Sequence, residues 1–247
     1  MNAPRPEEIL IGAVARCISR ARHIAVGAAS PIPGAAALLQ RRLSGGATRV
    51  SMIHARYGNP FTDGGRELFD LVGQGRIDTF FLGGGEIDGA ANINLVAVGG
   101  YPRPAVRFPG SFGAAYMYYL VPRVVLFREE HSRRTLVERV AFVTAPGSSE
   151  SHVHRPGGAV ALITGKAAMS FDRTTRRFRL ESVHPGATLE DVLDNTGFEF
   201  DWTPDVPATP APPDDWLAAL RGPIAAELAA TYPRFAEAVF GAANGDR

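Results

Sequence analysis

Two polar side chains follow predicted strands and could take part in acid–base chemistry. Glu86 comes directly after the glycine run Gly83–Gly85, and a carboxylate in that setting could act as a general base or a nucleophile. His54 follows another predicted strand, where a neutral imidazole could transfer a proton. Each also has a structural interpretation. Glu86 could be a solvated edge residue, with Asp88 two positions later capping the turn. His54 could be a structural residue, since no catalytic partner is identifiable. Side-chain chemistry by itself favours the structural interpretation.

Two glycine-containing segments could bring a ligand close to the backbone. Gly84 and Gly85 lie at a predicted strand end, where the missing side chain permits close approach, although a tight turn explains them equally well. A loop of small residues that opens onto a predicted helix is more informative, because its backbone N–H groups could bind a phosphate or a developing oxyanion. The residues of this loop are Gly110, Ser111, Phe112, Gly113 and Ala114. Neither segment matches G-x-G-x-x-G or a Walker loop, so no nucleotide cofactor is indicated.

Histidines and arginines form two further clusters with weaker signals. His152 and His154 have a spacing seen in metal sites, but no third ligand is evident, and we predict no metal centre. A basic cluster follows a predicted strand and could be a solvated face, a subunit contact or, less often, an anion site. Its members are Arg128, His131, Arg133 and Arg134.

Composition excludes several functional classes. The 247 residues include 26 Lys+Arg against 25 Asp+Glu, a net charge of +1, which gives little general attraction to nucleic acids. The single cysteine, Cys17, excludes an intrachain disulfide and a cysteine-rich zinc site, and its apolar surroundings predict a core position. No stretch approaches the ~20 apolar residues of a membrane span, and the N-terminus lacks the pattern of a signal peptide. We therefore expect a cytoplasmic protein that binds neither nucleic acid nor membrane.

The alternation of helical and strand patterns predicts an α/β fold. The spacing of these patterns indicates βαβ units, and hence an open, mostly parallel sheet with helices on both faces. Small-molecule sites in such sheets lie at the carboxyl ends of the strands. Helices are predicted over residues 6–18, 34–42, 67–72 and 185–193, and strands over 23–29, 49–54, 78–82, 123–127, 137–144, 159–164 and 178–182.

The last part of the chain differs in composition from the rest. Proline recurs five times between Thr203 and Pro213, which predicts an extended arm. A closing helix is predicted over Trp216–Phe240, with breaks near Pro223 and Pro233. We therefore divide the chain into a domain over residues 1–202 and an arm with a C-terminal helix over residues 203–247.

Five colinear segments resemble the β subunits of class I CoA-transferases. They include a Gly-Gly-Gly-Glu-Ile-Asp stretch similar to the family's Gly-Gly-Ala-Gln-Ile-Asp, a Pro-Gly-Ser loop, an Arg-Arg pair and an Asp-Val-Leu segment followed by Thr-Gly-Phe. The segments are Leu82–Asn94, Pro104–Ala114, Glu130–Arg134, Phe142–Gly147 and Glu190–Phe198. The resemblance is nearest to the β subunit of glutaconate CoA-transferase and its relatives, which include a steroid ring-opening hydrolase and a glutaconyl-CoA-type decarboxylase.

This resemblance implies a CoA-transferase fold and a chain that works with a homologous α-type subunit, with the active site at their interface. It implies a coenzyme A thioester of a di- or oxo-acid as substrate, and no tightly bound cofactor. It also assigns the contacts to CoA and the acyl group to Gly84 and Gly85 and to the loop Gly110–Ala114. Phe112 stands where the family has a glycine, and Glu86 where it has a glutamine.

One departure from the family changes the expected chemistry. The transferases carry a glutamate at the end of the second strand, which attacks the acyl-CoA, whereas this sequence has Ile53 or His54 at that position. Without the carboxylate, no acyl-enzyme anhydride can form there. We therefore expect C–C hydrolysis or decarboxylation, with His54 and Glu86 as the polar groups. The alternatives are CoA transfer with a nucleophile elsewhere, and a non-catalytic subunit that supports an active partner.

Overall fold

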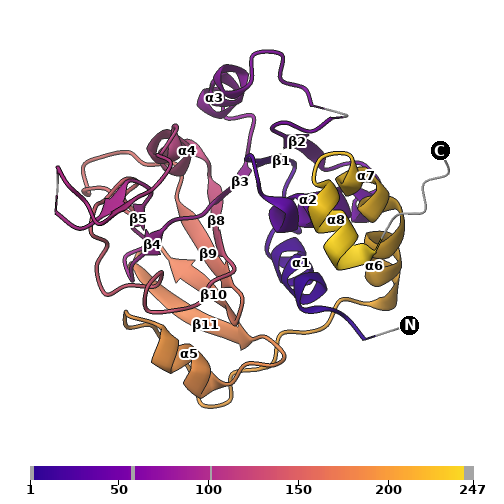
Figure 1. The fold of residues 1–247 in the computed structure, drawn as a ribbon. Coiled ribbons are helices and arrows are strands. Elements are labelled where there is room, and N and C mark those ends of the chain that lie inside the picture. Colours follow the sequence, from indigo (N-terminus) through magenta and orange to yellow (C-terminus); the bar gives the residue numbers. More distant parts are fainter. Residues whose placement is uncertain (1–2, 57–58, 101, 242–247) are drawn as a thin grey trace. The chain divides into compact units, whose positions relative to one another are not determined.

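The computed structural model describes residues 3–56, 59–100 and 102–241, which form two compact units. One unit contains the chain up to Phe81 together with the segment from Pro210 onward, and the other contains Leu82–Thr209. The predicted α/β class is confirmed, because helices alternate with strands along the chain and several of these strands pair in parallel (Figure 1). These two units group the residues differently from the predicted division into residues 1–202 and 203–247. That division into domains stays a prediction.

The first unit contains three parallel strands and most of the long helices. The strand order is β3-β1-β2, with Ile24 of β1 aligned to Thr79 and Val50 of its two neighbours. The β1 strand is buried throughout, as the unbroken apolar pattern predicts. The elements are α1 (Pro6–Cys17), β1 (His23–Val26), α2 (Pro31–Leu43), β2 (Arg49–Met52), α3 (Gly65–Gly73), β3 (Thr79–Leu82), α6 (Asp214–Ala219), η1 (Leu220–Ile224), α7 (Ala225–Ala229) and α8 (Pro233–Phe240). The sequence of residues 57–65, rich in glycine, asparagine and proline, predicts a loop, and part of this segment lies outside the described residues.

A buried ion pair ties the start of this unit to its C-terminal helices. Glu8, in the first turn of α1, has no exposed surface, and its two oxygens accept hydrogen bonds of 2.7 Å from Arg221 of η1. The same carboxylate accepts a bond from the Arg5 backbone N–H and so closes a capping box. Figure 1 shows α1, α2 and α6–α8 side by side in this unit. The segments at the two ends of the chain therefore form one hydrophobic core.

The predicted interruptions of the closing helix are confirmed. Pro223 lies inside η1, where Gly222 has non-helical φ and ψ of −111° and −105°, and Pro233 begins α8. A proline removes an intrahelical N–H donor and clashes with the preceding turn, so the four short helices replace one long one. Cys17, predicted as a core residue, is only half-buried at the end of α1.

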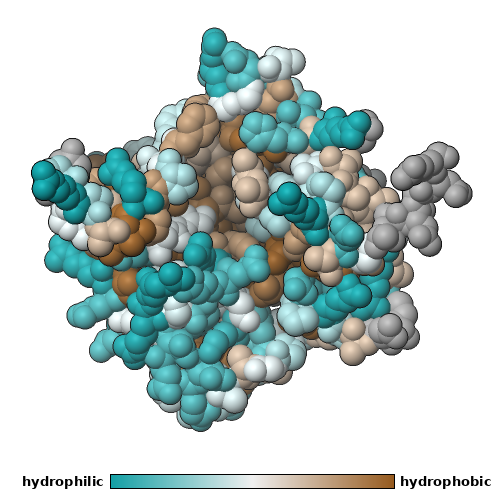
Figure 2. Space-filling view, in the orientation of Figure 1, coloured by the Kyte–Doolittle hydropathy of each residue, from teal (hydrophilic) through white to brown (hydrophobic). Residues whose placement is uncertain are grey.

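The second unit contains a mixed sheet and two small hairpins. In the sheet, β8 runs parallel to β9, while β10 pairs antiparallel with both β9 and β11. Hydrophilic residues cover α5 on the face shown in Figure 2. The elements are β4 (Glu86–Ile87), β5 (Ile93–Asn94), β6 (Ala97–Val98), β7 (Val106–Arg107), α4 (Ala114–Leu120), β8 (Arg123–Arg128), β9 (Ala159–Thr164), β10 (Ala167–Asp172), β11 (Arg177–Val183) and α5 (Leu189–Asn195).

The strand predicted over residues 137–144 is wrong. This segment forms no ladder, and only single bridges flank it, from Leu136 to Ile87 and from Ala145 to Ile93. Two of its backbone N–H groups bond instead to buried carboxylates, that of Ala141 to Glu86 and that of Val140 to Asp88. Those of Val137 and Thr144 bond to the carbonyls of Ile87 and Ile93, so the segment satisfies these four donors without forming a strand.

Two further elements of this unit, α5 and β10, differ in how well the sequence predicts them. The capping box predicted for Thr188 and Asp191 at the start of α5 is confirmed, with reciprocal bonds of 3.1 and 3.0 Å. The sequence pattern does not predict β10, because its small and polar residues give a weak apolar alternation.

In the described part of the chain, no helix is long and apolar enough to cross a membrane.

Two buried histidines in this unit are held neutral. His131 and His184 are 6% and 4% exposed, and burial lowers the pKa of each to about 4. The imidazole nitrogens of His131 lie 2.7 and 3.0 Å from the hydroxyls of Thr164 and Thr196. His184 contacts the Thr209 hydroxyl and the Thr164 carbonyl at 2.7 and 3.0 Å. His131 therefore belongs to the core and not to the predicted basic cluster.

Stability should fall as these histidines are protonated. A folded-state pKa below the ordinary value of about 6.5 means that the unfolded chain binds more protons, so the stabilisation is complete above pH 6.5 and is lost as the pH falls toward 4. The loss should reach about 3 kcal/mol per histidine at most. Urea unfolding between pH 7.5 and 4.5 measures it.

The His131→Gln variant should show a shallower dependence of unfolding free energy on pH across this window. The exposed His152→Gln is the matched control and should keep the wild-type slope. An unchanged slope in His131→Gln would contradict the assignment. Glu130 does not interfere, because its folded-state pKa of about 2 places its own contribution at lower pH.

Candidate functional site

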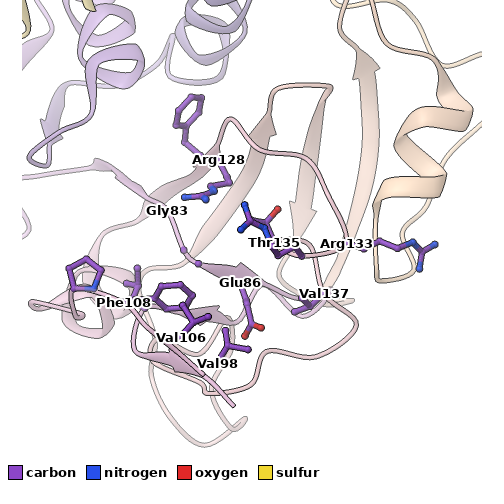
Figure 3. A pocket seen from close by; sticks show the side chains of 15 residues that line it. Gly83, Glu86, Val98, Val106, Phe108, Arg128, Arg133, Thr135 and Val137 are labelled. Carbon is purple, nitrogen blue, oxygen red and sulfur yellow. The ribbon is translucent and has the colours of Figure 1, made fainter. Parts of the chain in front are cut away.

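A cavity of about 660 Å³ lies within the second unit (Figure 3). It combines a glycine run at the end of β3, an apolar wall from the hairpins and three arginines. Gly84, Gly85 and Glu86 of the predicted site line it together. The full lining is Gly83, Gly84, Gly85, Glu86, Leu95, Val98, Val106, Phe108, Pro109, Phe127, Arg128, Arg133, Arg134, Thr135 and Val137.

The glycine run is fixed by close packing. A Cβ atom on Gly85 would lie 2.1 Å from Cζ of Phe108, and one on Gly84 would lie 2.6 Å from Cγ2 of Ile93. The Gly85 N–H also donates a 2.9 Å hydrogen bond to the Asn94 carbonyl. The space beside Gly85 is therefore occupied by the Phe108 ring, which forms one wall of the cavity. Tight packing thus accounts for the glycines, and ligand contact at these positions stays a prediction.

Glu86 is buried and held by uncharged donors. The residue is 6% exposed, so the solvated-edge interpretation is wrong. Its Oε2 accepts bonds of 2.8 Å from Asn94 Nδ2 and from the Ala141 N–H. Figure 3 shows the carboxylate directed toward Val98 and Val137, away from Gly83. Glu86 lines the cavity and its two bonds give it a structural role, so its role in acid–base chemistry stays a prediction.

Asp88 has the structural role that the sequence suggested. Its Oδ1 accepts bonds of 3.1 and 3.0 Å from the N–H groups of Ala90 and Asn92, and its Oδ2 accepts a 3.1 Å bond from Asn92 Nδ2. These bonds close the turn between β4 and β5, where Ala91 has a positive φ of 59°. Asp88 is therefore the anchor of a turn and not a candidate for catalysis.

His54 lies in the first unit, two residues after β2. It is exposed and has a φ of 63°, in the left-handed region that residues other than glycine rarely adopt. Arg56, just beyond it, donates its backbone N–H to the Thr231 hydroxyl at 3.4 Å. A strained residue at the carboxyl end of a parallel strand is where functional side chains are often found.

The loop Gly110–Ala114 leads into α4 as predicted, with Gly113 at the N-cap in a left-handed conformation. It does not line the cavity, which it adjoins through Pro109. Phe112 is 78% exposed, and the Ala114 N–H already donates a 2.7 Å bond to the Ser111 carbonyl. A role for this loop in binding CoA stays a prediction.

Two of the three arginines of the basic cluster, Arg128 and Arg134, bind one carboxylate. Glu130 accepts bonds of 3.0 and 2.8 Å from Nε and Nη2 of Arg134 and a 3.3 Å bond from Nη2 of Arg128. Hydrogen bonds from Arg134 and then Ser132 lower the pKa of Glu130 to about 2. Arg133 donates to the Asp194 carbonyl at 2.6 Å, and Figure 3 shows its side chain directed away from Glu86.

The histidine pair of the loop before β9 gathers no further ligands. Nδ1 of the exposed His152 lies 3.5 Å from a carboxylate oxygen of Glu150, and the carbonyl of His154 accepts a bond from the Tyr119 hydroxyl. Within residues 3–56, 59–100 and 102–241, no three His, Cys, Asp or Glu side chains come together in a way that could hold a metal ion.

The family model for coenzyme A transferase matches residues 6–195. The chain belongs to the coenzyme A transferase family. This result confirms the resemblance of the five segments, and it covers both β2 and the whole cavity lining. The match ends before α6–α8, although these helices pack in the first unit.

Individual relatives differ in the reactions that their names state. The β subunit of 3-oxoadipate CoA-transferase from Pseudomonas knackmussii is 39% identical over 60% of this chain and 58% of its own length. The IpdB subunit of the cholesterol ring-cleaving hydrolase from Rhodococcus jostii is 28% identical over 63% and 62%. The crystal structure of the decarboxylase AibA/AibB matches with a TM-score of 0.74 and 25% identity, covering 97% and 100%. The chain thus spans about three fifths of the curated relatives it matches.

The contact of Gly85 with Phe108 yields a test of the cavity wall. Gly85→Ala should lower the free energy of unfolding by about 2 kcal/mol, because the new methyl group overlaps the ring. Urea denaturation measures the loss. Gly100→Ala is the control, since among the described residues no atom beyond its chain neighbours lies within 4 Å of a Cβ at that position, and it should change stability by less than about 0.5 kcal/mol.

The double variant Gly85→Ala/Phe108→Ala separates this contact from a general backbone effect. Removal of the ring should make the added methyl group nearly neutral, so the two changes should be strongly non-additive. Additive losses would show that Phe108 does not press on Gly85.

Proposed function

We propose that this chain is the β-type subunit of a heteromeric enzyme of the coenzyme A transferase family, assembled with a homologous α-type subunit. The family match over residues 6–195 carries this proposal. The names of the relatives support it, because they describe one subunit of a transferase, an IpdB subunit and an AibA/AibB pair. The substrate we propose is the CoA thioester of a di- or oxo-acid, bound without a resident cofactor.

We further propose that the reaction is not CoA transfer by the usual covalent route. Strand β2 ends at Met52, and Ile53–Arg56 contains no carboxylate. A transferase that passes CoA through an enzyme-bound acyl group needs such a nucleophile. C–C hydrolysis and decarboxylation do not, which is why the hydrolase and decarboxylase relatives are the better guide.

Both of these reactions can proceed through the same intermediate. Hydrolytic C–C cleavage adds water to a ketone carbonyl and releases a carboxylic acid, while decarboxylation releases carbon dioxide. In each reaction the electron pair of the broken C–C bond is delocalised onto the thioester oxygen as an enolate, and a proton then adds to carbon. The enzyme must therefore supply hydrogen-bond donors at the thioester oxygen and a nearby acid.

We propose Glu86 as the acid–base group of the cavity. Its burial beside an apolar wall suits proton transfer, and Gly84 and Gly85 form the backbone next to it. His54 is proposed as a second polar group, supported by its exposure and strained backbone at the end of β2. The residues proposed to contact CoA or the thioester oxygen are Gly110, Ser111, Phe112, Gly113 and Ala114.

Two alternatives remain in the proposal. The first is true CoA transfer with a nucleophile on the α-type subunit or elsewhere in this chain. The second is a subunit without catalytic groups that stabilises an active partner. The hydrogen bonds from Asn94 and Ala141 to Glu86 are the observation that favours the second, since they give Glu86 a structural role.

Covalent trapping distinguishes the first alternative. The assembled complex is incubated with glutaconyl-CoA, treated with borohydride and digested for peptide mass spectrometry. We expect no reduced glutamyl adduct on either chain, because no carboxylate follows β2. A glutamyl adduct on either subunit would establish CoA transfer and contradict the diverged reaction.

Substitution of the two polar groups distinguishes the second alternative. Glu86→Gln keeps the shape of the side chain and an acceptor for Asn94 and Ala141, so the thermal midpoint should change little. Turnover should fall about 100-fold or more if Glu86 transfers a proton. Full turnover in Glu86→Gln would favour the structural role.

For His54, the two variants to compare are His54→Ala and His54→Asn. Both remove the imidazole, but asparagine tolerates a left-handed backbone better than alanine does. If the imidazole acts in the reaction, both variants should lose turnover alike. If only the backbone conformation matters, His54→Asn should retain activity.

A further inference from the structure

We infer that Arg128 is a specificity-determining residue that binds a carboxylate on the acyl group of the thioester. This inference rests on the proposed function and deepens it, since it assigns one end of the cavity to one chemical group of the substrate. It depends on three features of the second unit: the unsatisfied donor of Arg128, the engagement of the other arginines, and the apolar wall between Arg128 and the hairpins.

Arg128 has a hydrogen-bond donor without an acceptor. Its Nε is buried and has no hydrogen-bond partner among the described residues, whereas buried donors in native structures are almost always paired. The residue is the last of β8 and lines the cavity, and in Figure 3 its guanidinium lies beside Gly83. An acceptor supplied by a ligand would satisfy this donor.

The other arginines of the lining are already engaged. Arg134 binds Glu130 through two hydrogen bonds, and Arg133 donates to the Asp194 carbonyl. The guanidinium of Arg128 is held by a 3.3 Å bond from its Nη2 to Glu130. Arg128 is thus positioned by Glu130 but keeps its Nε edge for another acceptor.

The charges at this end of the cavity call for an anion. Arg128 and Arg134 share the single carboxylate of Glu130, which leaves one positive charge in excess. Glu86 does not compensate it, because its carboxylate is directed toward Asn94 and Ala141. A guanidinium edge with one free Nε–H and an adjacent Nη–H matches the two oxygens of a carboxylate.

The remaining lining indicates which anion fits. An apolar wall suits a short carbon chain, and its members are Leu95, Val98, Val106, Phe127 and Val137. The phosphates of CoA are separated from the thioester by the long pantetheine arm, so they need not enter the same cavity as the acyl group. A terminal carboxylate of the acyl chain therefore fits Arg128 better than a phosphate does.

The test compares three ligands on the full chain assembled with its α-type partner. Isothermal titration with glutaryl-CoA, butyryl-CoA and CoA separates the acyl carboxylate from the phosphates, because all three carry the same nucleotide. Arg128→Gln should weaken glutaryl-CoA binding about 10-fold or more, and change butyryl-CoA and CoA less than about 2-fold. Arg128→Lys keeps the charge but loses the Nε donor, so its loss should be intermediate.

Arg139→Gln is the matched control, since Arg139 is exposed and does not line the cavity. It should bind all three ligands as the wild type does. Thermal midpoints of all variants show whether they are folded, and Arg128→Lys provides the test if Arg128→Gln unfolds.

Three outcomes would overturn the inference. Equal losses for glutaryl-CoA, butyryl-CoA and CoA would assign Arg128 to a phosphate. No loss for glutaryl-CoA would show that Arg128 binds no ligand anion. If the wild-type complex binds none of the three ligands, the proposed function itself fails, and this result differs from the others because it does not depend on a variant.

Discussion

The burial of two carboxylates, Glu86 and Asp88, is the constraint on which the second unit depends. A carboxylate away from water needs hydrogen-bond partners, and here they come from Asn92 and Asn94 and from the backbone of Val140 and Ala141. These bonds hold an irregular segment against the β4–β5 hairpin, whose two strands have only two residues each. The cavity wall is built on this network, so the geometry of the site and the stability of the unit have the same origin.

The same network explains why sequence patterns predict some elements and miss others. Apolar periodicity and capping residues are sufficient for α1, β1, β2, β3 and α5, because local sequence and burial agree there. Residues 137–144 have the apolar alternation of a strand, but two of their backbone donors bond to carboxylates about 50 residues earlier. Such long-range pairing leaves no local signal.

The candidate site is predictable in part, for a related reason. The glycine run and Glu86 stand out in the sequence and do line one cavity. The burial of Glu86 and of His131 is not predictable, since each depends on partners far along the chain, such as Ala141 and Thr196. The sequence identifies Arg128 only as a member of the basic cluster with Arg133 and Arg134. The structure distinguishes it, because its Nε lacks an acceptor among the described residues while the other two guanidinium groups are hydrogen-bonded.

The ion pair between Glu8 and Arg221 has a consequence for how the chain matures during synthesis. The second unit is continuous from Leu82 to Thr209, so all of its contacts become available once that stretch has left the ribosome. The first unit contains both earlier and later residues. Its helix α1 is made before the second unit, yet the buried Glu8 lacks the counter-charge of Arg221 until η1 emerges. The second unit can therefore complete its fold before the first unit, although residues up to Phe81 of the first unit are synthesised earlier.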